Sequence, residues 1–242
     1  MDRKIKVSPD VDSLIIEAAG RIVDAAETAR GAGRKFSLAL SGGKTPEGLY
    51  RILASSAYRT RIDWPGVEIY FGDERCVPPD SDQSNFRMAN AALLSKVPIP
   101  GDQIHRMRGE IDPQIAAKEY GELLKGKFGD GGMDMILLGM GDDGHTASLF
   151  PHTAALAEQK HRCVANYVEK LKTWRVTMTF PFINRAAAVL ILVAGKDKAA
   201  RLSEVLEGPR DPDRLPIQRI APETGVLTWL LDAGAAGMHE DE

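Results

Sequence analysis

The sequence predicts a protein of the α/β class, built on a mostly parallel sheet with helices on both faces. Short apolar runs alternate along the 242 residues with longer segments whose apolar residues recur at helical spacing. Several short runs are apolar throughout, as residues 187–194 are, which is typical of strands buried on both faces. We expect a single domain over residues 1–242, because domains hold roughly 100–200 residues and no internal repeat divides the chain.

The bulk composition is that of a globular protein and argues against several kinds of partner. Hydrophobic residues make up 43% of the chain and charged residues 27%. The formal net charge of −3 predicts neither a nucleic-acid nor a membrane-surface partner. Cys76 and Cys163 are too few for a disulfide framework, and residues 1–14 lack an apolar signal sequence, so we expect a cytoplasmic protein. No apolar run approaches the ~20 residues that a membrane-spanning helix needs.

Helices and strands alternate through the first half of the chain. Residues 11–29 carry apolar side chains at helical spacing and are followed by Gly31, so they predict a helix. Residues 36–40 form a short apolar run that predicts a buried strand, and Pro46 suits the first turn of a helix over residues 46–57. The same criteria predict a strand at residues 67–71 and helices at residues 85–96 and 113–128.

The second half of the chain continues this alternation. Its apolar runs predict strands at residues 133–138, 162–167, 174–180, 187–194 and 226–231. Residues 196–207 predict a helix, whereas the polar, proline-bearing residues 207–215 predict a loop.

Three loops directly follow predicted strands, at residues 41–46, 72–79 and 139–146. In open parallel sheets, ligands bind outside the carboxyl ends of the strands. If the three strands are parallel, their loops share one edge of the sheet, and a single pocket could draw on all of them.

A glycine pair lies in the first of these loops, which has the sequence Ser41-Gly42-Gly43-Lys44-Thr45-Pro46. Glycines let successive N–H groups converge on an anion, and the following helix N-terminus adds positive potential, so phosphate is the expected ligand. The match to a nucleoside-triphosphate loop fails, because Leu38 stands where that motif needs a glycine. A tight turn without a ligand is the alternative interpretation.

Charged side chains gather in the second loop, where Asp73, Glu74 and Arg75 follow Gly72. Such acids and an arginine can bind the hydroxyls and phosphate of a sugar phosphate, since the planar guanidinium suits phosphate. A solvated group of surface charges is the alternative.

The third loop holds the candidate for proton transfer, His145. Imidazole titrates near neutral pH, and Asp143 lies on the same side of an extended segment, where it can fix the tautomer of the ring. Residues 139–144 also match the dinucleotide pattern G-x-G-x-x-G, but the two aspartates in this segment would repel a pyrophosphate, so we expect no nicotinamide cofactor. A surface histidine on a structural turn is the alternative.

Two further cations are candidates for phosphate binding. Lys196 opens the predicted helix at residues 196–207, and Arg175 opens the predicted strand at residues 174–180. A surface lysine and an edge charge are the alternatives. The histidines show no metal-ligand spacing, and no G-x-S-x-G segment occurs, so we expect neither a metal site nor a serine nucleophile.

Taken together, the order and spacing of these motifs resemble the 6-phosphogluconolactonases, which belong to the family of glucosamine-6-phosphate isomerases and 6-phosphogluconolactonases. The matching segments are LALSGGKTP, FGDERCVPPDSDQSNF, LLGMGDDGHTASLFP, RVTMTFPFIN, LVAGKDKA and TWLLD. The resemblance implies a Rossmann-like fold shared with glucosamine-6-phosphate deaminases. It also implies hydrolysis of 6-phospho-D-glucono-1,5-lactone to 6-phospho-D-gluconate in the oxidative pentose phosphate pathway, without a metal or organic cofactor.

The resemblance further implies roles for the candidate residues. His145 would deprotonate water, Asp143 would orient His145, and Arg75 would bind phosphate or stabilise charge near the reacting carbonyl. The substrate would be held by Ser41, Gly42, Gly43, Lys44, Thr45, Asp73, Lys196 and Arg175. The sequence leaves open whether Arg175 or Arg185 contacts the phosphate, and whether the protein is a monomer or a homodimer.

The sequence leaves two other functions as alternatives. An amino-sugar-phosphate deaminase on the same fold typically carries a glutamate three residues past the motif histidine, where this chain has Ser148, and a tyrosine at the position of Arg75. A non-catalytic sugar-phosphate sensor is usually fused to a helix-turn-helix domain, for which this chain has no room.

Overall fold

The computed structural model describes residues 3–238, and its centre is a six-stranded sheet in the order β1-β9-β8-β5-β2-β3. Every pairing in this sheet is parallel, which confirms the predicted parallel sheet. Its strands are β1 (Arg3–Ser8), β2 (Phe36–Leu40), β3 (Val67–Phe71), β5 (Met135–Gly139), β8 (Ala188–Val193) and β9 (Val226–Asp232).

A second, smaller sheet is antiparallel, in the order β4-β7-β6. Its strands are β4 (Asp73–Arg75), β6 (Cys163–Val168) and β7 (Thr173–Met178). Two expectations need correction here. The second loop contains β4, and the strand predicted at residues 174–180 ends at Met178 because Phe180 begins a helical turn. The two sheets are joined where Met178 N–H donates to the carbonyl of Gly72 (2.8 Å).

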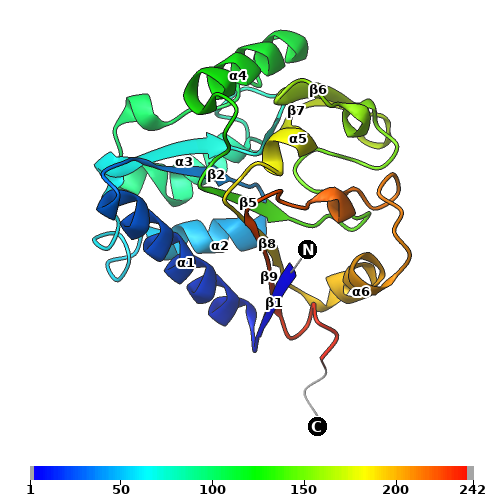
Figure 1. Cartoon of the computed structure of the whole chain (residues 1–242), viewed down its shortest axis with the longest axis horizontal. Helices are drawn as coiled ribbons and strands as arrows, with labels where there is room; N and C mark the ends of the chain where they lie inside the picture. Colours follow the sequence, from blue (N-terminus) through cyan, green and yellow to red (C-terminus); the bar gives the residue numbers. More distant parts are fainter. Residues whose placement is uncertain (1–2, 239–242) are drawn as a thin grey trace.

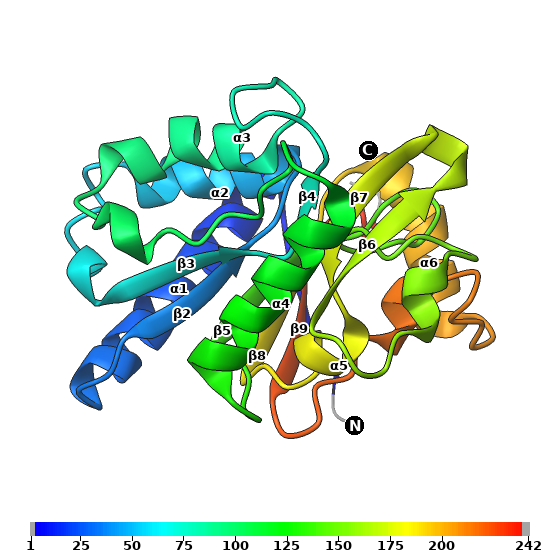
Figure 2. The same ribbon diagram turned by 90° about the horizontal axis from the view of Figure 1, so that it is seen from above.

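Helices cover the large sheet on both faces, as the sequence predicted (Figures 1 and 2). They are α1 (Val11–Gly31), α2 (Lys44–Leu53), α3 (Asn85–Ala92), α4 (Pro113–Phe128), α5 (Phe180–Ile183) and α6 (Ala199–Glu207). The predicted helix at residues 46–57 ends early, because residues 54–61 form turns. Residues 196–198 form a 3-10 turn before α6.

Each face of the large sheet has its own hydrophobic core. Along β5, Met135 and Leu137 join buried residues of α1, α2 and α3, whereas Ile136 and Leu138 join those of α4, α5 and α6. This alternation follows from the two-residue period of side chains along a strand. Continuous apolar sequence is therefore required, because both faces of β5 are covered.

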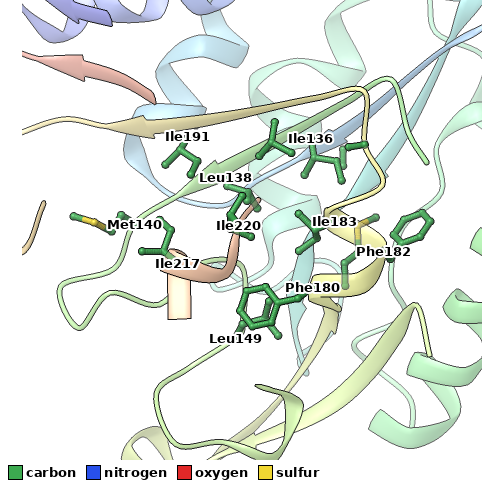
Figure 3. Packing of buried hydrophobic residues seen from close by; sticks show 14 of the residues in the cluster. Ile136, Leu138, Met140, Leu149, Phe180, Phe182, Ile183, Ile191, Ile217 and Ile220 are labelled. Carbon is green, nitrogen blue, oxygen red and sulfur yellow. The ribbon is translucent and has the colours of Figure 1, made fainter. Parts of the chain in front are cut away.

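The second core also anchors the loop that carries His145. Met140, at the start of this loop, and Leu149, just beyond its end, are buried among side chains of α5 and of residues 217–220 (Figure 3). With both ends of the loop buried, its central residues are held in place above the sheet.

The carboxyl ends of β2, β3 and β5 lie at one edge, since the three strands are parallel neighbours. The three loops that follow them therefore meet, as predicted. No helix within residues 3–238 is long and apolar enough to cross a membrane.

Candidate active site

The loop after β5 is closed on itself so that His145 faces the carboxyl edge of the sheet. Gly141 N–H donates to the carbonyl of His145 (2.9 Å), and the hydroxyl of Thr146 donates to the carbonyl of Gly139 (2.8 Å). A Cβ at Gly141 would lie 2.1 Å from Nδ1 and Cε1 of His145. Position 141 therefore needs glycine, because the imidazole packs directly against the backbone there.

Asp143 and Phe150 fix the orientation of the His145 ring. The Nδ1 atom lies 2.6 Å from Oδ1 of Asp143, and the ring stacks on Phe150 with centroids 4.0 Å apart. An ionised carboxylate can only accept, so Nδ1 carries the proton and Nε2 of the neutral ring is free to accept one. The predicted Asp143–His145 pair is present in the structure.

Asp143 remains ionised well into the acid range. Burial acts to raise the pKa of Asp143, but hydrogen bonds from the ring and backbone of His145, together with Lys170, lower this pKa far below its ordinary value. Lys170 was not predicted; its Nζ lies 3.2 Å from Oδ2 of Asp143.

Two arginines from neighbouring strands face the same space. Arg75 in β4 pairs in register with Arg175 in β7. Burial, and then the charge of Arg75, lower the pKa of Arg175. Such like charges, held together and partly withdrawn from water, create a strong preference for an anion.

Asp73 is held by side chains from two other segments. The hydroxyl of Ser148 donates to its Oδ2 (2.6 Å), and the amide of Asn85 donates to its Oδ1 (3.2 Å). Asn85 also explains a glycine of the first loop, because a Cβ at Gly42 would lie 2.1 Å from Oδ1 of Asn85. The first two loops and α3 thus pack as one unit.

Glu74 has a structural role rather than the sugar-binding role that its charge suggested. It is 2% exposed, and its carboxylate accepts from the N–H groups of Arg75, Asn85 and Phe86 at 2.7–2.8 Å. Burial raises the pKa of Glu74, and these N–H donors oppose that rise. Glu74 anchors the start of α3 beside Arg75.

Two adjoining hollows open at this edge of the sheet. The hairpin-side hollow, of about 260 Å³, is lined by Asp73, Arg75, Asp142, Asp143, His145, Ala147, Ser148, Phe150, Lys170, Leu171 and Arg175. The loop-side hollow, of about 200 Å³, is lined by Ser41, Gly42, Gly43, Asp73, Arg75, Asn85, Gly139, Met140, Gly141, His145, Thr146 and Ala147. His145 and Arg75 line both, so one ligand could span them.

Three predicted substrate-binding residues are not among those that line these hollows. Lys44 and Thr45 form the first turn of α2, and Lys196 is exposed at the carboxyl end of β8. Lys198, two residues further on, pairs instead with Asp142 at the hairpin-side hollow. Its sequence signal was its place in the segment LVAGKDKA.

Arg175 and Arg185 lie at opposite edges of the large sheet. Arg175 lines the hairpin-side hollow. Arg185 precedes β8, and its carbonyl packs against Gly132 just before β5, so it lies at the amino edge of the sheet. Within residues 3–238, no group of three or more His, Cys, Asp or Glu could hold a metal ion, and His239 lies outside the described residues.

Comparison with known proteins agrees with this geometry. A family model described as glucosamine-6-phosphate isomerases/6-phosphogluconolactonase matches residues 9–229. A 6-phosphogluconolactonase of Nostoc sp. is 38% identical over 97% of this chain and 98% of that protein. The structure of 6-phosphogluconolactonase from Trypanosoma brucei is 28% identical, with a TM-score of 0.86 over 98% of each chain. A monomeric glucosamine-6-phosphate deaminase, 22% identical over 98% of this chain and 100% of its own, has a TM-score of 0.82, which confirms the shared fold.

Proposed function

This chain belongs to the family of glucosamine-6-phosphate isomerases and 6-phosphogluconolactonases, and we propose that it hydrolyses 6-phospho-D-glucono-1,5-lactone with His145 as general base. The product is 6-phospho-D-gluconate, and the reaction belongs to the oxidative pentose phosphate pathway. The observation that supports this role most directly is the 2.6 Å contact between His145 Nδ1 and Asp143, which leaves Nε2 as the proton acceptor.

The reaction requires a water molecule to add to the lactone carbonyl. Nε2 of His145 takes one proton from water as the oxygen attacks C1, a contribution of typically ~10²–10⁴-fold for a positioned base. The tetrahedral oxyanion then collapses, the bond between C1 and the ring oxygen breaks, and the imidazolium returns its proton to that oxygen. Asp143 stabilises the imidazolium in the interval, and Arg75 stabilises negative charge on the carbonyl oxygen.

The phosphate of the substrate needs donors at some distance from His145. Ser41, Gly42 and Gly43 line the loop-side hollow at the start of α2, where backbone N–H groups favour an anion. We further propose additional contacts to the phosphate from Lys44, Thr45, Lys196 and Lys198. Asp73 is fixed by Ser148 and Asn85, so its carboxylate can accept a hydroxyl of the sugar.

The site lacks the glutamate that a deaminase on this fold typically carries. The hydroxyl of Ser148, three residues past His145, donates its hydrogen bond to Asp73, and this side chain carries no carboxylate. We also propose that residues 1–242 act as one domain, because both sheets contribute to the same hollows. We place the protein in the cytoplasm, since the thiols of Cys76 and Cys163 are free.

A lactonase assay on His145→Asn tests the proposal. The lactone is made in situ from glucose-6-phosphate, and acid production is measured against the uncatalysed rate. We expect His145→Asn to lose most activity while its circular dichroism and its affinity for 6-phosphogluconate persist. His152→Asn is the matched control, because His152 is exposed and lines neither hollow. Near-normal activity of His145→Asn would refute the assignment, and ammonia release from glucosamine-6-phosphate would favour the deaminase.

Two separate lysine variants test the proposed contacts to the substrate phosphate. We expect Lys196→Ala and Lys198→Ala to raise KM and to weaken binding of 6-phosphogluconate, with kcat less affected. Unchanged affinity in either variant removes that lysine from the phosphate site.

A further inference from the structure

The hairpin between β6 and β7 brings a lysine to the candidate active site from a distant part of the chain. The two strands run side by side (Figure 2) and are joined by a 3-10 turn, Glu169–Leu171. The pairing of Val168 with Thr173 closes the hairpin. Lys170 and Leu171 of this turn line the hairpin-side hollow.

The carboxylate of Asp143 is divided between two partners. Its Oδ1 faces His145 Nδ1 at 2.6 Å, and its Oδ2 accepts from Nζ of Lys170 at 3.2 Å. Asp143 and His145 sit on the loop after β5, whereas Lys170 comes from the small sheet. One carboxylate therefore bridges the candidate base and the hairpin.

We propose that Lys170 is a positioning residue for the lactonase reaction, acting through Asp143 on His145. This inference rests on the proposed role of His145. A carboxylate can rotate about its Cβ–Cγ bond, and the ammonium bound to Oδ2 opposes rotation that would turn Oδ1 away from the ring. The ammonium also offsets part of the charge of Asp143. A protonated His145 is then held less tightly and can return its proton to the leaving ring oxygen.

A direct contact between Lys170 and the substrate phosphate would have a different kinetic signature. Lys170 shares its hollow with Arg75 and Arg175, so a purely phosphate-binding lysine would alter KM and product affinity. Loss of a positioning lysine instead lowers kcat, because it changes the orientation of His145 and not the binding of the sugar.

The Lys170→Met variant separates these roles. We expect its kcat to fall roughly threefold to tenfold, the lower part of the range for contacting groups in one network, with KM and affinity for 6-phosphogluconate unchanged. Lys170→Arg should restore most of the loss, since arginine keeps a donor for Oδ2. Lys172→Met is the matched control, because Lys172 is exposed directly after this turn and lines neither hollow.

A double-mutant cycle shows whether Lys170 acts through Asp143. In an Asp143→Asn background, Lys170→Met should lower kcat no further, because the bridge is already broken. In the proton NMR spectrum, the downfield Nδ1–H signal of His145 should weaken in Lys170→Met and persist in Lys172→Met. Full kcat in Lys170→Met, a change in KM alone, or an equal loss of kcat in both backgrounds overturns the inference. An inactive His145→Asn beside a fully active Lys170→Met would overturn this inference and leave the proposed function standing.

Discussion

Arg75 and Arg175 are register partners across the antiparallel pair of β4 and β7, so two guanidinium groups share one side of the candidate active site. The backbone carbonyl of Gln83 accepts from Arg75, and that of Trp174 accepts from Arg175 (3.0 Å). Neither contact neutralises the charge. The fold thus holds two cations together, and an anionic ligand relieves their repulsion.

We expect Arg175→Gln to weaken binding of 6-phosphogluconate roughly tenfold to a hundredfold, as loss of a charge-assisted hydrogen bond costs about 1.5–3 kcal/mol. Thermal stability without ligand should stay the same or rise slightly, because the repulsion with Arg75 is removed. Calorimetric titration and thermal melts measure the two quantities. Arg185→Gln is the matched control, because Arg185 lies at the opposite edge of the sheet. An affinity loss in Arg185→Gln equal to that in Arg175→Gln would contradict the prediction.

A methyl group at position 141 should displace the imidazole of His145. The added Cβ of Gly141→Ala would lie 2.1 Å from ring atoms of His145. The ring must move to relieve this contact, and a displacement of about 1 Å at a reacting group can cost ~100-fold in rate. We expect that loss in kcat, with circular dichroism unchanged. Gly126→Ala, where nothing lies within 4 Å, should keep full activity. Wild-type kcat in Gly141→Ala would show that the ring position is not critical.

The buried parallel strands could be predicted from sequence because their environment is uniform. The interior strands β2 and β8 are covered on both faces, and their largely apolar sequences, FSLAL and AVLILV, reflect this directly. The strand β1 was missed because it is an edge strand with mostly exposed side chains, and three of the six residues in its sequence, RKIKVS, are basic. The three polar residues of β4 carry no strand pattern at all.

The candidate site could be predicted only where its residues are neighbours in sequence. Asp143 and His145 are two residues apart, so their contact follows from local geometry. Lys170 reaches Asp143 from 27 residues away, and Ser148 reaches Asp73 from 75 residues away. Such contacts depend on how the two sheets pack, which no local pattern records.

Replacing Glu74 with glutamine should destabilise the protein although the shape of the side chain is kept. Both carboxylate oxygens face donors: Oε1 accepts from Arg75 and Asn85, and Oε2 accepts from Phe86 and Ser84. An amide would point its own N–H groups at these donors, and a buried unsatisfied group costs about 1–3 kcal/mol. Urea denaturation of Glu74→Gln measures this loss.

Glu47→Gln supplies the comparison for Glu74→Gln. Glu47 pairs with Arg51 one helical turn away at the surface, where such a pair contributes only about 0.2–0.5 kcal/mol. Equal destabilisation by the two substitutions would contradict the role given to Glu74.

The last prediction concerns acid stability and follows from Asp143. Its pKa is lowered in the folded protein: burial opposes this, but the hydrogen bonds and charge of His145, with Lys170, outweigh burial. A carboxyl whose pKa is lower in the folded state stabilises the protein above its ordinary pKa of roughly 3.9, and this stabilisation fades as pH falls toward the folded value. The Asp143→Asn variant lacks this stabilisation at every pH. In thermal melts between about pH 3 and pH 6, the difference in melting temperature between wild type and Asp143→Asn should therefore become smaller below about pH 4. The control is Asp80→Asn, in an exposed loop, whose difference in melting temperature from wild type should stay constant over this pH range. An equally constant difference for Asp143→Asn would show that His145 and Lys170 do not hold this carboxylate ionised.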